Sequence, residues 1–218
     1  MRVVIAGGHG KIALLLERLL AERGDQAVGL IRNPDHVADV RTAGAEAVVC
    51  DLEAASADDV AVLLSGADAV VFAAGAGPGS GVPRKDSVDR GGSVLMADAA
   101  ERAGVRRFVQ ISSMGAGRPP RPGSDEVWAA YITAKTAAEA DLRARDLDWT
   151  VVRPGGLTDA PATGKIRLAP PPVPGGTVPR ADVAAVIAAL LDEPGTRHQT
   201  LELVSGDSPV AAAVHSIS

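Results

Sequence analysis

The fold is decided by residues 2–13, which read RVVIAGGHGKIA. A short run of β-branched residues ends in a glycine-rich turn, and apolar residues three and four positions apart follow over residues 11–23. This pattern predicts a strand, a tight turn and a helix in immediate succession. A glycine pattern in that context indicates a phosphate-binding turn, whereas the same glycines elsewhere would be weak evidence.

Two glycine patterns overlap in this turn, namely Gly8-x-Gly10-x-x-Ala13 and Gly7-x-x-Gly10-x-x-Ala13. Glycines let the backbone turn tightly and approach a pyrophosphate, and Ala13 lets the helix pack closely on the strand. The helix N-terminus then offers free N–H groups to the phosphates. The residues predicted to contact the cofactor here are Gly7, Gly8, His9, Gly10, Lys11 and Ile12. An ordinary tight turn is the alternative.

Short apolar runs alternate with helical patterns along the whole chain. The runs typical of buried strands are 2–6, 27–31, 45–50, 69–74, 107–112, 149–153 and 200–204. The helical patterns are 11–23, 35–43, 57–64, 87–103, 126–145 and 180–192. Such alternation predicts right-handed crossovers, and therefore an α/β fold with a doubly wound parallel sheet in one Rossmann-type domain, residues 1–218.

Three segments rich in glycine and proline interrupt this rhythm after the fourth, fifth and sixth predicted strands. They predict loops near residues 76–85, 114–125 and 155–176. In an open parallel sheet these loops gather at the carboxyl edge, where ligands bind. We therefore expect them to surround a small-molecule substrate, with plain flexible connections as the alternative.

Composition excludes several classes of protein. The net charge of −5 argues against a nucleic-acid surface, which is usually basic. The only cysteine is Cys50, so neither an intrachain disulfide nor a cysteine metal site is expected, and no metal is predicted. No apolar run approaches the ~20 residues of a membrane helix, and no signal peptide is evident. We expect a cytoplasmic protein that is a monomer or a small homo-oligomer.

The residues after the second and third predicted strands bear on the choice of cofactor. Arg32 stands near the position where an NAD site usually carries Asp or Glu for the ribose hydroxyls. A guanidinium group suits a 2′-phosphate, so the sequence favours NADP(H), with Lys11 as a second contact. Asp51 and Leu52 could hold the adenine ring. Equally, Asp51 could cap the helix that follows, and Arg32 could be an ordinary surface arginine.

Tyr131 is the only tyrosine, and Lys135, one of four lysines, follows four residues later on a predicted helix. The two side chains therefore share a helix face. In general, a nearby ammonium group favours the phenolate and so lowers the pKa of a tyrosine hydroxyl. Such a tyrosine can donate a proton to a carbonyl oxygen as hydride arrives. Lys135 could also bind the nicotinamide ribose. Ser112 and Ser113 end the fifth strand beside this pair.

Together these residues resemble the short-chain dehydrogenase/reductase superfamily, and within it the atypical branch of small NAD(P)H-binding proteins that includes biliverdin-IXβ/flavin reductase-like members. The resemblance covers nearly the whole chain and includes Tyr131-x-x-x-Lys135 and residues 152–157, which read VRPGGL. It implies that Ser113, Tyr131 and Lys135 form the catalytic set. It further implies cofactor contacts from Ala73, Ala74, Gly75, Ser112, Lys135, Pro154, Gly155 and Leu157.

One residue departs from the superfamily pattern, since Asp89 stands where extended members often carry Asn. Many atypical members lack a catalytic residue, but here the set is complete. We therefore expect an NADP(H)-dependent oxidoreductase that reduces a small carbonyl, quinone, flavin or tetrapyrrole-like substrate. The alternatives are a non-catalytic NADP(H)-binding redox sensor and an epimerase or isomerase that retains its cofactor.

Overall fold

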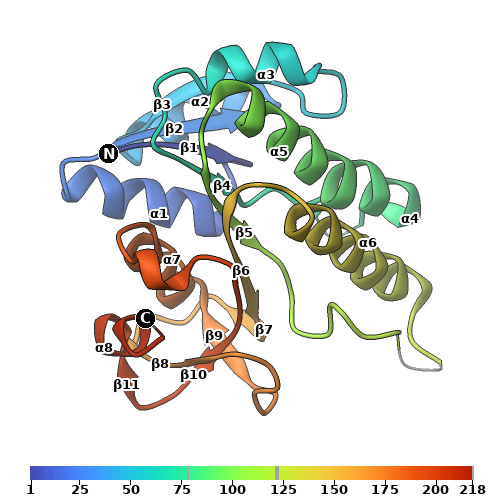
Figure 1. Ribbon diagram of the computed structural model, residues 1–218, viewed down its shortest axis with the longest axis vertical. Helices are drawn as coiled ribbons and strands as arrows, with labels where there is room; N and C mark the ends of the chain where they lie inside the picture. Colours follow the sequence, from blue (N-terminus) through green and yellow to red (C-terminus); the bar gives the residue numbers. More distant parts are fainter. Residues whose placement is uncertain (78, 121–122, 218) are drawn as a thin grey trace.

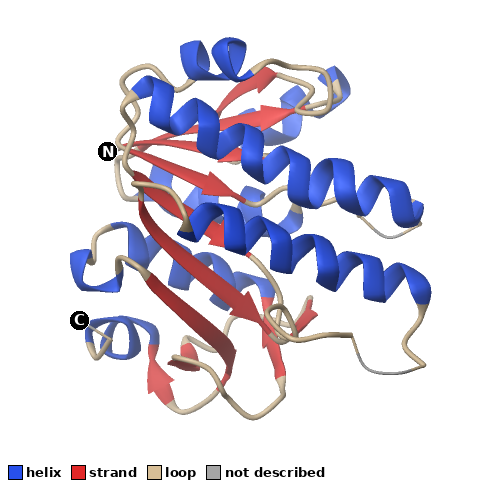
Figure 2. Cartoon of the chain, turned by 45° about the vertical axis from the view of Figure 1, so that its right-hand side comes forward, coloured by secondary structure: helices blue, strands red, loops and turns tan. Residues whose placement is uncertain are grey.

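The computed structural model describes residues 1–77, 79–120 and 123–217, and these residues form a twisted sheet with helices on both faces (Figures 1 and 2). The large sheet has the strand order β11-β8-β10-β6-β5-β4-β1-β2-β3. Its strands are β1 (Arg2–Ala6), β2 (Gln26–Ile31), β3 (Glu46–Val49), β4 (Ala69–Phe72), β5 (Arg107–Ile111), β6 (Asp148–Pro154), β8 (Lys165–Ala169), β10 (Gln199–Ser205) and β11 (Ser208–Pro209). A small second sheet pairs β7 (Gly156–Thr158) with β9 (Thr177–Pro179).

The helices connect successive strands and cover the sheet. They are α1 (Lys11–Glu22), α2 (Val37–Thr42), α3 (Ala57–Leu63), α4 (Gly81–Arg84), α5 (Gly92–Ala103), α6 (Glu126–Arg143), α7 (Arg180–Leu191) and α8 (Val210–His215). Short 3-10 turns η1 (Pro34–His36) and η3 (Pro194–Thr196) and the π-helical turn η2 (Lys85–Gly91) complete them. Across the described residues, no helix has the length and apolar character needed to cross a membrane.

The strand order confirms the predicted doubly wound α/β fold. Strands β3, β2, β1, β4, β5, β6 and β10 are all parallel to one another. The chain reverses its winding direction between β1 and β4, and a sheet of this kind binds ligands outside the carboxyl ends of the strands at such a reversal. The fold therefore places the ends of β1 and β4 at the centre of the candidate site.

The sequence prediction is wrong in two of the segments expected to be loops. Residues 155–176 contain β7 and β8, and β8 joins the edge of the sheet antiparallel to β10. Residues 81–85 are helical, so the helix expected over 87–103 begins earlier, through α4 and η2. The glycines and prolines suggested irregular chain, but β8 alternates exposed and buried residues, which is typical of an antiparallel strand with one solvated face. Residues 78, 121 and 122 of the expected loops lie outside the described residues.

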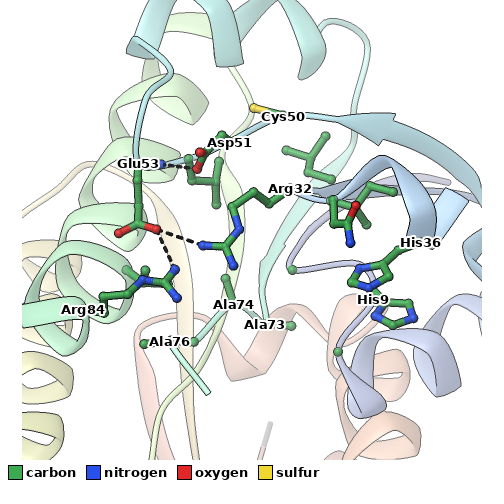
Figure 3. A pocket seen from close by; sticks show the side chains of 18 residues that line it. His9, Arg32, His36, Cys50, Asp51, Glu53, Ala73, Ala74, Ala76 and Arg84 are labelled. Carbon is green, nitrogen blue, oxygen red and sulfur yellow. Dashed lines mark hydrogen bonds and ion pairs between the residues drawn. The ribbon is translucent and has the colours of Figure 1, made fainter. Parts of the chain in front are cut away.

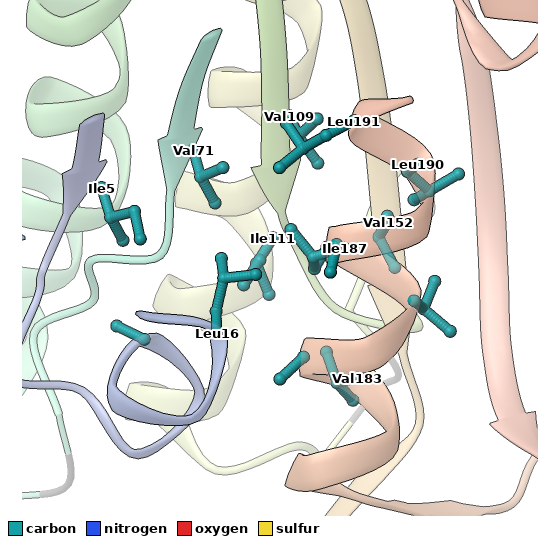
Figure 4. Packing of buried hydrophobic residues seen from close by; sticks show 14 of the residues in the cluster. Ile5, Leu16, Val71, Val109, Ile111, Val152, Val183, Ile187, Leu190 and Leu191 are labelled. Atoms are coloured by element: carbon teal, nitrogen blue, oxygen red, sulfur yellow. The ribbon is translucent and has the colours of Figure 1, made fainter. Parts of the chain in front are cut away.

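Two apolar layers hold the helices on the sheet. On one face, α1 and α7 pack side by side over the central strands through Leu16, Val183 and Ile187, which are fully buried (Figure 4). On the other face, α3, α5 and α6 cover the second layer, which includes the fully buried Phe72 and Phe108. With both faces covered, the parallel strands can be almost wholly apolar, which is the pattern that the sequence displayed.

Glu17 is an exception to this apolar packing. It lies on α1 beneath the glycine turn and is fully buried, and neither carboxyl oxygen has a hydrogen-bond partner among the described residues. A Cβ atom placed on Gly29 of β2 would lie 2.5 Å from Glu17 Oε1, so the carboxyl group fills the space that the glycine leaves. Burial raises the pKa of Glu17 to about 8, and the group is therefore protonated at neutral pH.

We predict that this carboxyl group makes stability depend on pH. Its pKa is about 8 in the folded protein against an ordinary value of 4.5, so the folded state binds an extra proton between these values. Stability should therefore fall as the pH rises through this window, by up to about 1.4 kcal/mol per pH unit. The variant Glu17→Gln, which cannot titrate, should lack this decline in urea unfolding measured between pH 5 and pH 8.

The matched control is Glu22→Gln, which removes an exposed carboxyl group from the same helix. This control should follow the wild-type pH dependence. A difference in unfolding free energy between wild type and Glu17→Gln that stays constant from pH 5 to pH 8 would contradict the assignment.

Candidate functional site

The glycine turn between β1 and α1 is held by its own backbone. The N–H groups of Gly7 and Gly8 both donate to the carbonyl oxygen of Leu30, at 3.1 and 2.9 Å, and Gly10 N–H donates to Gly7 O at 2.8 Å. Gly7 has a φ of 80°, and a Cβ atom there would lie 2.7 Å from Ala74 Cα. Only glycine fits this position, because both its conformation and its surroundings exclude a side chain.

The first turn of α1 is free to receive an anion. Gly10 precedes the helix, no side chain caps the N-terminal N–H groups, and the first turn contains no acidic residue. Uncapped N–H groups at the positive end of a helix form a binding site for phosphate. The backbone cradle and the open helix end therefore fit a dinucleotide pyrophosphate.

A cavity of about 300 Å³ opens beside this turn, at the carboxyl ends of β1, β2, β3 and β4 (Figure 3). We refer to it as the first cavity. Most of the residues that the sequence predicted for the nucleotide half of the cofactor line it: Gly7, His9, Gly10, Arg32, Asp51, Leu52, Ala73, Ala74 and Gly75. Strands far apart in the sequence meet here because the parallel sheet aligns their carboxyl ends.

A carboxylate joins two arginines in the wall of the first cavity (Figure 3). Glu53 Oε2 accepts hydrogen bonds from Arg32 Nη1 at 3.2 Å and from Arg84 Nη2 at 2.6 Å, and Ser87 Oγ donates to Oε1 at 2.6 Å. The hydrogen bond from Arg84 is the main reason that the pKa of Glu53 is lowered. Two guanidinium groups thus converge on one anionic group beside the cavity.

The structure excludes one of the two roles considered for Asp51. It does not cap the next helix, since Ser56 caps α3 in a reciprocal capping box with Asp59. Asp51 Oδ1 instead accepts a hydrogen bond from the N–H of Glu53 at 3.0 Å. Its carboxylate shapes the turn that carries Glu53 while lining the first cavity.

Lys11 has a different partner from the one predicted. Its ammonium group donates to Asp159 Oδ2 at 2.6 Å, and Arg180 donates to the other carboxylate oxygen of Asp159 at 2.6 Å. The hydrogen bond from Lys11 is the main cause of the lowered pKa of Asp159. Lys11 therefore connects the glycine turn to the segment after β7, and it does not reinforce Arg32 as expected.

A second cavity, of about 1100 Å³, lies where the chain continues beyond β5 and β6. The predicted residues that line it are Ser113, Tyr131, Pro154, Gly155 and Leu157. Sequence reasoning missed other members of its wall, among them Lys85, Arg118, Trp128, Arg180 and Glu202. The chain has four lysines and two tryptophans, so the scarcity of these residue types was the only signal that could have singled out Lys85 or Trp128.

Tyr131 and Lys135 lie one turn apart on α6, and their neighbours differ. Tyr131 lines the second cavity, whereas Lys135 is buried below it, with Nζ 5.7 Å from the centre of the Tyr131 ring. Lys135 Nζ also donates to the carbonyl oxygen of Ile111 at 3.2 Å and lies 3.2 Å from Asp89 Oδ1. The contact with Asp89 is electrostatic, because this oxygen accepts no hydrogen bond from the described residues.

The two serines at the end of β5 have different environments. Ser112 is buried and donates to Glu139 Oε1 at 2.5 Å, so its hydroxyl belongs to the internal ion pair of Glu139 with Arg153 and not to a cofactor contact. Ser113 lines the second cavity, and its hydroxyl makes only a long contact of 3.3 Å with Met114 O. Of the two, Ser113 is the one available to a substrate.

Five residues predicted to contact the cofactor line neither cavity, namely Gly8, Lys11, Ile12, Ser112 and Lys135. Gly8 faces β2, where a Cβ atom would lie 2.6 Å from Gly29 Cα, and Ile12 packs against the apolar layer of α1. Both residues support the turn from below. Among the described residues, no group of three or more His, Cys, Asp and Glu side chains could hold a metal ion.

Comparison with known proteins agrees with this geometry. Residues 7–194 match the model of a family described as NAD(P)H-binding. A Bacillus subtilis protein named as the uncharacterized sugar epimerase YhfK is 34% identical over 218 residues, which is the full length of both chains.

Two solved structures have the same fold. One, from Bacillus halodurans and assigned provisionally to the NAD-dependent epimerases/dehydratases, is 35% identical with a TM-score of 0.91 over 99% of both chains. ChuY from Escherichia coli O157:H7, described as an anaerobillin reductase, is 28% identical with a TM-score of 0.79 over 95% of this chain and 98% of its own. The chain therefore belongs to the family of NAD(P)H-binding proteins with a Rossmann-like fold.

Proposed function

We propose that this protein is an NADPH-dependent reductase of a small carbonyl, quinone, flavin or tetrapyrrole-like compound. The observation that supports this most directly is the lining of the second cavity. Tyr131, Ser113 and the Pro154–Leu157 segment meet there, beyond a glycine turn built to hold a pyrophosphate. The description of ChuY as a reductase supports the same class of reaction.

The proposed roles follow from the groups that each residue offers. A bound reduced nicotinamide would supply the hydride. The hydroxyl of Tyr131 donates the proton to the substrate oxygen, and Ser113 orients that oxygen through a hydrogen bond. In the first cavity, Arg32 and Arg84 hold the 2′-phosphate, which competes with Glu53 for the two guanidinium groups.

The name of the Bacillus subtilis relative makes sugar epimerisation the competing function. The two functions differ in what happens to the cofactor, since a reductase consumes NADPH and an epimerase leaves its cofactor unchanged at the end of each turnover. Purified protein should therefore oxidise NADPH when screened against quinones, flavins and aldehydes. Tightly retained cofactor without net consumption would favour the epimerase, and reversible binding without any turnover would favour a redox sensor.

The first prediction concerns the phosphate turn. Gly10 has an extended backbone with a φ of −65°, which valine tolerates, so Gly10→Val should fold. Its side chain would enter the space that the pyrophosphate needs, because Gly10 lines the first cavity, and its Cβ atom, 3.1 Å from Gly7 O, would also crowd the turn. We expect NADPH binding to be lost in calorimetry while thermal unfolding stays cooperative. Undiminished binding by the folded variant would place the phosphate site elsewhere.

The second prediction concerns the preference for NADPH over NADH. Loss of a charge-assisted contact to the 2′-phosphate weakens binding by about 1.5–3 kcal/mol, which is about 10- to 150-fold in affinity. Arg32→Ala should therefore weaken NADPH binding by about this factor and leave NADH binding nearly unchanged. Arg41→Ala, which removes an exposed arginine of α2 outside the cavity, is the control. Equal affinities of the wild type for both cofactors would overturn the preference, whatever the variants do.

The third prediction concerns Tyr131. Tyr131→Phe removes the hydroxyl and keeps the ring, so the packing of α6 should survive. Loss of the proton donor should reduce kcat by about 10²–10⁴-fold, with NADPH affinity nearly unchanged. The measurement is steady-state turnover of an accepted substrate together with NADPH titration. A variant that retains near-wild-type kcat would remove Tyr131 from the chemistry, and the proton would then come from water.

A further inference from the structure

Lys85 is a buried cation in the wall of the second cavity. It begins the π-helical turn η2, and only 8% of the residue is exposed. Its ammonium group donates one hydrogen bond, to the carbonyl oxygen of Gly77 at 2.8 Å. An ammonium group has three N–H donors, so Lys85 has donors left for a molecule in the cavity.

The charge of Lys85 has no counter-ion in the part of the chain that the structure describes. The two carboxylates on its own turn have other partners, since Asp86 pairs with Arg90 and Asp89 pairs with Lys135. The group on the facing helix α6 is Tyr131, whose ring centre lies 5.5 Å from Lys85 Nζ. Leaving a buried charge without a partner is unfavourable unless a ligand supplies one.

The two lysines near Tyr131 therefore differ in what they can do. Their Nζ atoms lie at similar distances from the Tyr131 ring centre, 5.5 Å for Lys85 and 5.7 Å for Lys135. The charge of Lys135 is balanced by Asp89, and its side chain lies outside the lining of the second cavity. Of these two lysines only Lys85 lines that cavity, so it is the lysine that a substrate beside Tyr131 can reach.

We propose that Lys85 is a catalytic residue whose ammonium group binds the reacting oxygen of the substrate, so that the cavity selects compounds whose oxygen carries or develops negative charge, such as ionised enols and quinones. This inference rests on the proposed reductase function and names a residue and a substrate class for it. A preformed cation at that point stabilises charge that increases during the reaction, which is a large contribution to rate in a site that excludes water.

The proposed hydride and proton transfers involve only the substrate, the nicotinamide, Tyr131 and water, with Lys85 as a hydrogen-bond donor. As the substrate carbon gains hydride from a reduced nicotinamide, a C–H bond forms and the π electrons of the C=O bond move onto the oxygen. Lys85 donates a hydrogen bond to that oxygen, and the Tyr131 hydroxyl transfers its proton to it. Tyr131 regains a proton from water, the substrate is reduced by two electrons, and the nicotinamide is oxidised by two.

The test uses two ligands of similar shape and different charge. The anionic probe is 2-hydroxy-1,4-naphthoquinone, an acidic enol that is ionised at neutral pH, and the neutral probe is 2-methyl-1,4-naphthoquinone. Calorimetry measures the affinity of each for the NADP⁺-loaded protein and for the protein alone. The wild type should bind the anion more tightly. Lys85→Met should weaken binding of the anion by about 10- to 100-fold and change binding of the neutral probe by less than about threefold.

Two further variants keep the test specific. Lys85→Arg keeps the positive charge and should retain most of the preference for the anion. Arg118→Met removes an exposed cation from the same cavity and should leave the preference unchanged. The proposal is overturned if Lys85→Met weakens both probes equally, if it changes neither, or if the wild type binds neither probe. Failure of the reductase proposal is seen separately, as a wild type that does not bind NADPH or does not oxidise it with any acceptor.

Discussion

The close approach of three backbone segments at the glycine turn is the constraint on which the site depends. The N–H groups of Gly7 and Gly8 share the carbonyl oxygen of Leu30 from β2, while Gly7 lies against the backbone of Ala74 at the end of β4. Side chains at these two glycines would overlap neighbouring backbone atoms. This contact fixes where β1 ends between β2 and β4, and it directs the N-terminus of α1 into the groove that the two strands leave.

Buried charges organise the other side of the site. Glu139 on α6 is fully buried and accepts hydrogen bonds from Ser112, Arg143 and Arg153. Burial alone would raise the pKa of Glu139, but the hydrogen bonds from Arg153 and Ser112 outweigh it and lower the pKa. An ion pair of this kind is strongly destabilising to break, so it fixes α6 against β5 and β6. The positions of Tyr131 and Ser113 on those elements follow from it.

One short segment contributes to both cavities. Arg84 and Val88 line the first cavity, and Lys85 between them lines the second. The segment passes from α4 into the π-helical turn η2, whose Asp89 accepts a hydrogen bond from the N–H of Ala76 at 3.2 Å and pairs with Lys135. π-helical turns are rare and frequently occur at functional sites, and this one joins the walls of the two cavities.

The sequence by itself determined the alternation of strands and helices, the glycine turn and the placement of Tyr131 and Lys135 on one helix. Each of these is local, since a glycine pattern after a strand, a run of β-branched residues and a spacing of four are read within a few positions of the chain. Only the tertiary structure decided which groups meet across distant elements, such as Glu53 with Arg32 and Arg84, Lys11 with Asp159, and Lys85 with Tyr131. The partners of a charged side chain depend on how the helices and loops pack, and local sequence patterns do not specify that packing.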